Sequence, residues 1–178
     1  MATATCWLFG SAAERRQFET DRPVLSPAPE LLASGASWCP TADRVLIGTG
    51  LALPHDASSV RPALVILEQS ATGLPTVAAV VLGTAEEYRP ALRTAGCLLH
   101  HNGLVAGTGA PGVLAGNPVT ALATAVAAIE PREGQADDQL VVLSSITPPV
   151  AGSAADRFSL AVAGFGSVRL RLVEEGAR

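Results

Sequence analysis

The sequence has no lysine, and it carries little charge of either sign. All twelve basic side chains are arginine, and they stand against sixteen acidic side chains, for a formal net charge of −4. Without a lysine ε-amine no side chain can form a Schiff base or act as a lysine general base, which leaves only the N-terminal amine for that chemistry. Because so few cations cannot neutralise a run of phosphates, we expect no nucleic-acid partner.

Long apolar runs and paired cysteines are also missing. No stretch approaches the roughly eighteen apolar residues of a membrane-spanning helix, and the first ten residues lack the positive and apolar regions of a signal peptide. The three cysteines, Cys6, Cys39 and Cys97, follow no CxxC spacing, which favours free, buried thiols. We therefore predict a cytoplasmic protein that does not enter a membrane.

The composition does provide material for a hydrophobic core. Hydrophobic residues make up 48% of the chain and charged residues 16%, which argues against disorder. A domain of this size can bury about 70% of the surface that its unfolded chain exposes. Since no internal repeat or linker interrupts the sequence, we predict one domain over residues 1–178.

Local patterns predict a mixture of strands and helices. Asn102-Gly103 between two apolar runs is typical of a type I′ hairpin, because both turn positions favour positive φ. Asn117 and Pro118 predict the start of a helix, with one buried stripe formed by Val119, Leu122, Val126 and Ile129. The chain should therefore be an α+β domain with strongly bent sheets. Strands are expected at 44–47, 63–67, 77–82, 139–143, 158–162 and 168–173, and a short helix at 11–18.

Several motifs follow one another in an order that resembles one enzyme family. The C-terminal half contains Asn102-Gly103 and the segments 108–118, 143–147 and 164–168. This series is similar to the C-terminal half of the 2-keto-4-pentenoate hydratase and 4-oxalocrotonate decarboxylase family, within the fumarylacetoacetate hydrolase superfamily. The resemblance implies an α+β fold of mixed, strongly bent β-sheets with a few helices, and keto-acid chemistry through a divalent metal. Similar motifs upstream lie at 10–18, 21–23, 53–58 and 60–68.

The resemblance also implies where the family's catalytic groups would lie, and most of them are replaced. The family's lysine falls on Cys6, and its metal-binding Glu-x-Glu pair falls on Ala42-Asp43-Arg44. Its third ligand, an aspartate, falls on Glu68, whereas a glutamate of the same motif becomes Val65. A shift of one or two residues in this alignment would place Asp43 at a ligand position.

The charges at these positions argue against a metal. A hard divalent ion needs several oxygen ligands, and two or more of them are usually anionic. Glu68 with the cationic Arg44 beside it does not supply them. We therefore predict no metal and no other cofactor. Instead we expect Arg44 and Glu68 to form a catalytic pair in which the guanidinium replaces the metal and grips a carboxylate or enolate.

Four further residues are predicted to bind the substrate. Ser144 and Ser145 lie where relatives carry Leu-Ser-Gly-Ser, a loop on the side of the pocket that holds the substrate carboxylate. Cys6 stands at the position of the family's lysine, and Asn117 belongs to the 108–118 motif.

Two functions remain open. One is a metal-independent lyase or cyclase of specialised metabolism, which acts on a keto, enol or polyketide-like small molecule and stabilises an enolate-like transition state. The other is a non-catalytic partner subunit of an active relative. An apolar pocket with Arg44 and Glu68 inside would favour the enzyme, whereas a pocket filled by side chains would favour the partner subunit. We also expect a homo-oligomer, since uncovered apolar edges need a partner.

Overall fold

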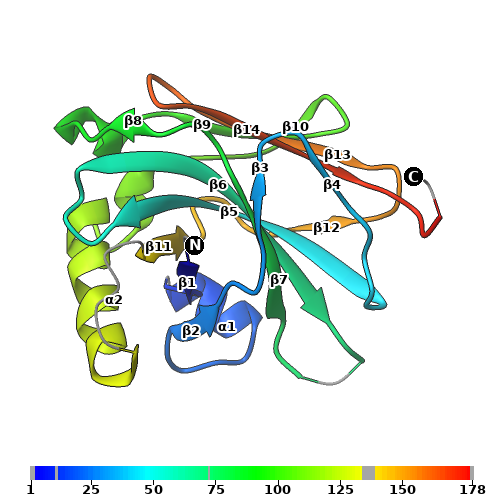
Figure 1. The fold of residues 1–178 in the computed structure, drawn as a ribbon, viewed down its shortest axis with the longest axis horizontal. Helices are drawn as coiled ribbons and strands as arrows, with labels where there is room; N and C mark the ends of the chain where they lie inside the picture. Colours follow the sequence, from blue (N-terminus) through cyan, green and yellow to red (C-terminus); the bar gives the residue numbers. More distant parts are fainter. Residues whose placement is uncertain (1–2, 11, 72, 134–138, 177–178) are drawn as a thin grey trace.

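Two curved β-sheets lie face to face and form most of the molecule (Figure 1). The structure is a computed structural model and describes residues 3–10, 12–71, 73–133 and 139–176. Within these residues the larger sheet has nine strands and the smaller sheet has five. The predicted class, an α+β fold of mixed and strongly bent sheets, is confirmed.

The larger sheet follows the order β2-β1-β11-β5-β6-β7-β3, with β12 beside β5 and β8 beside β6. Its strands are β1 (Thr3–Leu8), β2 (Val24–Pro27), β3 (Leu31–Ala33), β5 (Arg44–Pro54), β6 (Ser59–Gln69), β7 (Thr76–Leu82), β8 (Glu86–Glu87), β11 (Gln139–Ser144) and β12 (Val150–Gly152). The smaller sheet follows the order β10-β9-β13-β14-β4. Its strands are β4 (Ala36–Trp38), β9 (Cys97–His101), β10 (Leu104–Gly109), β13 (Arg157–Val162) and β14 (Gly166–Leu172). The helices are α1 (Ala12–Gln17), α2 (Pro118–Glu133) and the 3₁₀ turns η1 (Pro90–Thr94) and η2 (Pro111–Val113).

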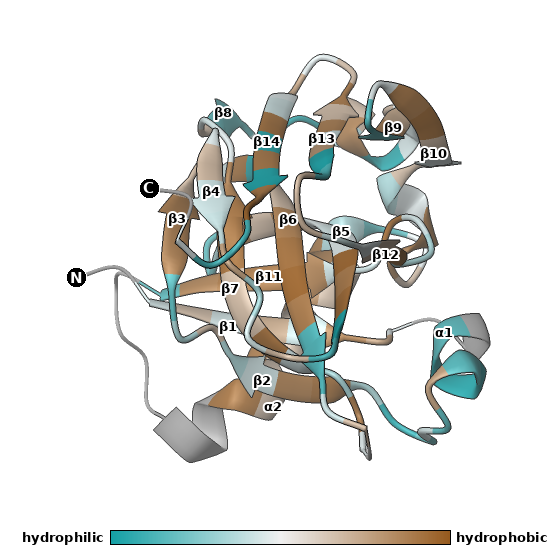
Figure 2. Cartoon of the chain, turned by 90° about the vertical axis from the view of Figure 1, so that its right-hand side faces the viewer, coloured by the Kyte–Doolittle hydropathy of each residue, from teal (hydrophilic) through white to brown (hydrophobic). Residues whose placement is uncertain are grey.

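The larger sheet buries side chains on both faces. Since successive strand residues point to opposite faces, the apolar run of β6 supplies two hydrophobic clusters. One cluster, the inter-sheet core, lies between the two sheets and includes Leu64 and Ile66. The other, the barrel core, lies inside the curl of the larger sheet and includes Val65 and Leu67. Figure 2 shows apolar colouring along β5 and β6 and a largely hydrophilic α1.

The hairpin between β9 and β10 forms as the sequence predicts. Asn102 and Gly103 both have positive φ, at 52° and 84°, as a type I′ turn requires. This turn lies at one end of the smaller sheet, where β9 also pairs with β13.

Helix α2 begins as predicted, and two residues of the predicted stripe, Leu122 and Ile129, are buried. Asn117 is its N-cap, because the Val119 backbone N–H donates a 3.0 Å hydrogen bond to Asn117 Oδ1. The other two residues of the stripe, Val119 and Val126, are only half-buried, whereas Ala121 and Ala125 are buried in their place. The buried residues of the helix include Ala121, Leu122, Ala125 and Ile129.

Two predictions drawn from what the sequence lacks can be compared with the structure. Cys6 and Cys97 are buried and Cys39 is half-buried, and all three are free thiols. In the described part of the chain, no helix is both long and apolar enough to cross a membrane.

Candidate functional site

Three of the predicted site residues meet in the barrel core. Strand β1 runs parallel to β11 and places Cys6 beside Val142. Ser144, two residues further along, is the last residue of β11, and Ser145 follows directly after the strand. All three side chains are buried, with exposed fractions of 0% for Cys6, 1% for Ser144 and 8% for Ser145. The parallel pairing of two distant strands therefore places three of the four predicted substrate-binding residues near one another, all but Asn117.

The two serines form a closed pair. Their Oγ atoms lie 3.0 Å apart, so each hydroxyl group has a hydrogen-bond partner in apolar surroundings. Gly48 leaves the room for them, because a Cβ at that position would lie 3.3 Å from Ser144 Oγ and 3.7 Å from Val65 Cβ. Among the described residues no histidine or carboxylate hydrogen-bonds to either hydroxyl group, so neither serine has the base that an activated nucleophile requires.

Cys6 is a core residue in the same cluster. Burial raises the pKa of its thiol to about 12, because an apolar environment disfavours the thiolate. The thiol therefore stays neutral at physiological pH and does not act as a nucleophile.

Glu68 joins the two sheets. It lies near the end of β6, on the side that faces the smaller sheet, and its carboxylate accepts three hydrogen bonds. Trp38 Nε1 and the Thr41 backbone N–H donate to Oε1, both at 3.1 Å, and Thr41 Oγ1 donates to Oε2 at 2.6 Å. Burial alone would raise the pKa of Glu68, but these hydrogen bonds outweigh it and lower the pKa below its ordinary value. Glu68 is thus an ionised acceptor without the raised pKa that favours a general acid.

The predicted contact between Arg44 and Glu68 is not formed. Arg44 is the register partner of Gln69, and Arg44 Nη1 donates a 3.2 Å hydrogen bond to Gln69 Oε1. Gln69 follows Glu68 directly on β6, so their side chains point to opposite faces of the sheet. Arg44 shares the face of its partner Gln69 and therefore points away from Glu68. Arg44 therefore borders an exposed hollow of about 440 Å³ with Phe18 and Leu74, whereas Glu68 faces Trp38.

Asn117 lies apart from all of these residues. Its side-chain oxygen is engaged in capping α2, so the structure gives it a local role in the helix. The predicted site residues thus divide among the barrel core, the junction of the sheets, the start of β5 and the start of α2.

An apolar hollow that the sequence analysis missed lies between β1, η2 and α2. It measures about 220 Å³, and we call it the Trp7 hollow. Trp7 and Thr124 are its two lining residues with polar side-chain atoms. A Cβ on Gly10 would lie 3.3 Å from Trp7 Nε1, and no described residue accepts the hydrogen of this atom. No single motif marks the hollow, because its walls come from distant segments. They include Trp7, Gly10, Pro23, Val113, Leu114, Ala115, Ala121 and Thr124.

Solved structures of keto-acid enzymes share this fold. The 4-oxalocrotonate decarboxylase from Pseudomonas putida G7, complexed with magnesium and adipate, is 17% identical, with a TM-score of 0.79 over 97% of this chain and 78% of that chain. The 2-hydroxyhepta-2,4-diene-1,7-dioate isomerase from Mycobacterium marinum is 12% identical, with a TM-score of 0.75 over 98% and 75% of the two chains. Fumarylpyruvate hydrolase from Pseudomonas aeruginosa, in complex with Mn²⁺ and pyruvate, is 13% identical, with a TM-score of 0.72 over 97% and 90%.

The likeness is one of structure. No profile of a known protein family matches the sequence, and no curated protein matches it either. The chain has the fold that these decarboxylase, isomerase and hydrolase structures share.

The residues of this chain do not fit the divalent ion that some of these structures hold. Asp43 is exposed, Glu68 is engaged with the smaller sheet, and Val65 lies on the opposite face with Gly48 beside it. Leu46, the other β5 residue nearby on that face, is also apolar. Within the described ranges no three histidine, cysteine, aspartate or glutamate side chains lie together in a way that could hold a metal ion.

Proposed function

We propose that this chain is a non-catalytic, hydratase-like partner subunit, which keeps the enzyme fold for assembly with an active relative. The observation that carries the proposal is the packing of the barrel core. Leu46, Val65 and Leu67 fill the inside of the curl, and Phe9 and Phe18 stack at a centroid distance of 4.4 Å beside them.

This packing opposes substrate binding inside the curl. Each of these apolar side chains is buried, and exposing one fully costs about 1.5–3 kcal/mol. A ligand that reached Ser144 would have to displace several of them at once. Such a cost is comparable with the whole stability of a typical domain, about 5–15 kcal/mol.

A surface suited to assembly lies along the β10 edge. Strand β10 pairs only with β9 in the described sheet, and it exposes Leu104 and Val105 to 75% and 57%. No charged residue occurs in the strand, although charges are a common protection of free edges. Figure 2 shows this strand as an apolar ribbon at the rim of the molecule. The proposed occupant of this edge is a second hydratase-like fold, either another copy of this chain or an active relative.

The experiment is a measurement of assembly. The purified chain, alone and mixed with a purified hydratase or 4-oxalocrotonate decarboxylase of the same organism, would be examined by size-exclusion chromatography with light scattering. We expect a defined oligomer or complex that Val105→Lys disrupts and that Leu74→Lys, at an exposed apolar residue elsewhere, leaves intact. A chain that forms no complex with the added enzyme would contradict the partner role, even if it forms oligomers on its own.

A metal-independent lyase or cyclase is the second candidate, and the Trp7 hollow favours it. The indole N–H of the half-buried Trp7, which no described residue engages, can donate a hydrogen bond to developing charge on an enolate oxygen. At about 220 Å³ the hollow is smaller than the 300–1,000 Å³ typical of ligand pockets, so it would hold a small keto or enol group or one end of a polyketide-like chain. Turnover of such compounds in the presence of a chelator, lost in Trp7→Phe, would support this activity over the partner role.

A further inference from the structure

Three arginines share the outward face of the β13–β14 hairpin. Arg157 on β13 lies directly opposite Arg171 on β14, and Arg169 precedes Arg171 by two residues on the same face. All three side chains are exposed. Cα atoms of directly opposed residues lie about 5 Å apart and those of residues i and i+2 on a strand about 7 Å apart. The three guanidinium groups can therefore reach one common ligand.

The three neighbouring arginines repel one another as long as no anion is bound between them. Like charges directly opposite one another destabilise an antiparallel pair. In the part of the chain that the structure describes, no ion pair joins these arginines to an acidic side chain, although the whole chain is acidic. The charges are thus concentrated without an internal partner.

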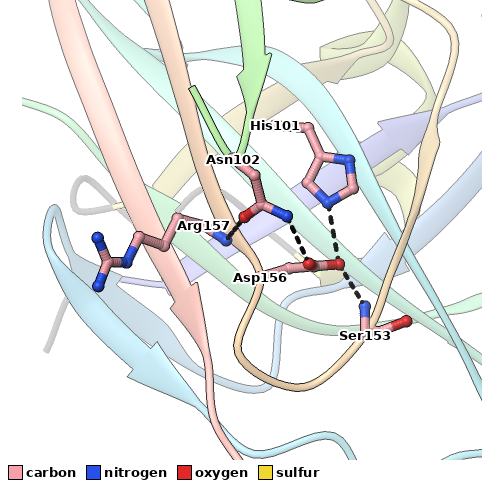
Figure 3. A network of polar contacts seen from close by, with 5 residues as sticks. All are labelled: His101, Asn102, Ser153, Asp156 and Arg157. Atoms are coloured by element: carbon pink, nitrogen blue, oxygen red, sulfur yellow. Dashed lines mark hydrogen bonds and ion pairs between the residues drawn. The ribbon is translucent and has the colours of Figure 1, made fainter. Parts of the chain in front are cut away.

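The nearest acid along the chain is committed elsewhere. Asp156 directly precedes Arg157, yet its carboxylate lies 2.9 Å from His101 Nε2 and accepts hydrogen bonds from Asn102 Nδ2 at 2.7 Å and the Ser153 backbone N–H at 2.8 Å. Figure 3 shows the Arg157 side chain extending away from this network. Asp156 and Arg157 are neighbours in sequence, but the contacts of Asp156 keep its carboxylate from forming an ion pair with Arg157.

The arginines border a hollow with a fixed backbone. The hollow measures about 510 Å³, within the range typical of small-molecule sites. The Arg169 backbone N–H donates to Ser34 Oγ at 3.0 Å, and the Gly35 backbone N–H donates to Arg169 O at 2.8 Å. We call this hollow the arginine groove. Besides the arginines, its lining includes Gly35, His100, Gly103 and Ser159.

We propose that the arginine groove binds a small molecule with two or more carboxylate or phosphate groups. A guanidinium fork pairs with either group through two parallel hydrogen bonds. Ser159, the register partner of Arg169, adds a hydroxyl group between the arginines and His100. The site lies on the outer face of the smaller sheet, so the inference holds whether or not the chain acts as a partner subunit.

The test uses citrate and pyrophosphate as probes, with sodium chloride at matched ionic strength as the reference. Thermal unfolding and isothermal titration calorimetry of the full chain would be measured at low salt. We expect saturable stabilisation by at least one probe, and the comparison of the two separates carboxylate from phosphate preference. In Arg171→Ala we expect binding at least about tenfold weaker, because a charge-assisted contact is lost.

A matched variant and a second readout make the result specific. Arg22→Ala removes an exposed arginine in the segment between α1 and β2 and should leave probe affinity unchanged. Without a probe, Arg171→Ala should have a Tm no lower than that of the parent chain, because the substitution removes the repulsion between Arg157 and Arg171. Equal effects of both variants, or no saturable stabilisation by either probe, would overturn the proposal. A change of oligomeric state in Arg171→Ala with unchanged probe affinity would instead make this face a protein interface.

Discussion

Replacing Glu68 tests whether this residue is a link between the sheets. In Glu68→Ala the Trp38 indole N–H and both Thr41 donors lose their acceptor. Trp38 is half-buried while Thr41 is exposed, so water can replace the acceptor for Thr41 but only poorly for Trp38. A catalytic role for Glu68 requires no such loss of stability.

The magnitude follows from the three donors. An unpaired, partly buried indole N–H costs about 1–3 kcal/mol, and the two rehydrated Thr41 contacts add about 0.5 kcal/mol each at most. We expect the free energy of unfolding to fall by about 2–3 kcal/mol, which lowers the Tm of a chain of this length by roughly 5–10 °C. Glu68→Gln keeps Oε1 and should lose only about 1 kcal/mol.

Urea denaturation and thermal melting measure these differences. The matched control is Arg44→Ala, at the neighbouring register position on the other face, which should stay within about 0.5 kcal/mol of the parent chain. Because the pKa of Glu68 is lowered in the folded state, its contribution should be present above the unfolded-state pKa and lost as the pH falls through the folded-state value. A Glu68→Ala chain as stable as the parent would refute the reasoning.

Three other predictions concern single groups. Cys6 should resist thiol alkylation in the folded chain and react once urea unfolds it, and rapid labelling of the native chain at Cys6, read by mass spectrometry, would contradict its burial. Burial favours a raised pKa for Asp156, yet hydrogen bonds from Asn102, Ser153 and His101 lower this pKa below its ordinary value. The stability of Asp156→Asn should therefore fall less steeply in acid than that of the parent chain. Urea titrations in which both chains lose stability in parallel as the pH falls would count against this. Asn117→Ala should cost about 1 kcal/mol through loss of the helix cap, whereas Asn117→Asp should restore most of it, as followed by circular dichroism during denaturation.

Local signals were sufficient for much of the fold. Asn102-Gly103 and Asn117-Pro118 gave a hairpin and a helix start, because turn and cap geometry depend on a few neighbouring residues. Strand β1 was missed, since its formation depends on parallel pairing with β11 more than 130 residues away. The short strands β3 and β4 likewise depend on distant partners.

The site was harder to predict for the same physical reason. Arg44 and Glu68 are on paired strands, but a difference of one residue in register places them on opposite faces. The Trp7 hollow and the arginine groove combine segments that lie far apart in the chain. Predicting these sites requires the register in which the strands pair, and residue types alone do not determine that register.

The parallel union of β1 and β11 has a consequence for synthesis of the chain. Thr3–Leu8 leaves the ribosome well before its partner Gln139–Ser144, which lies more than 130 residues further along the chain. Contacts of such long sequence separation form slowly. The apolar residues Cys6, Trp7 and Leu8 therefore stay exposed until β11 has been synthesised, and we expect chaperones to bind this segment during translation.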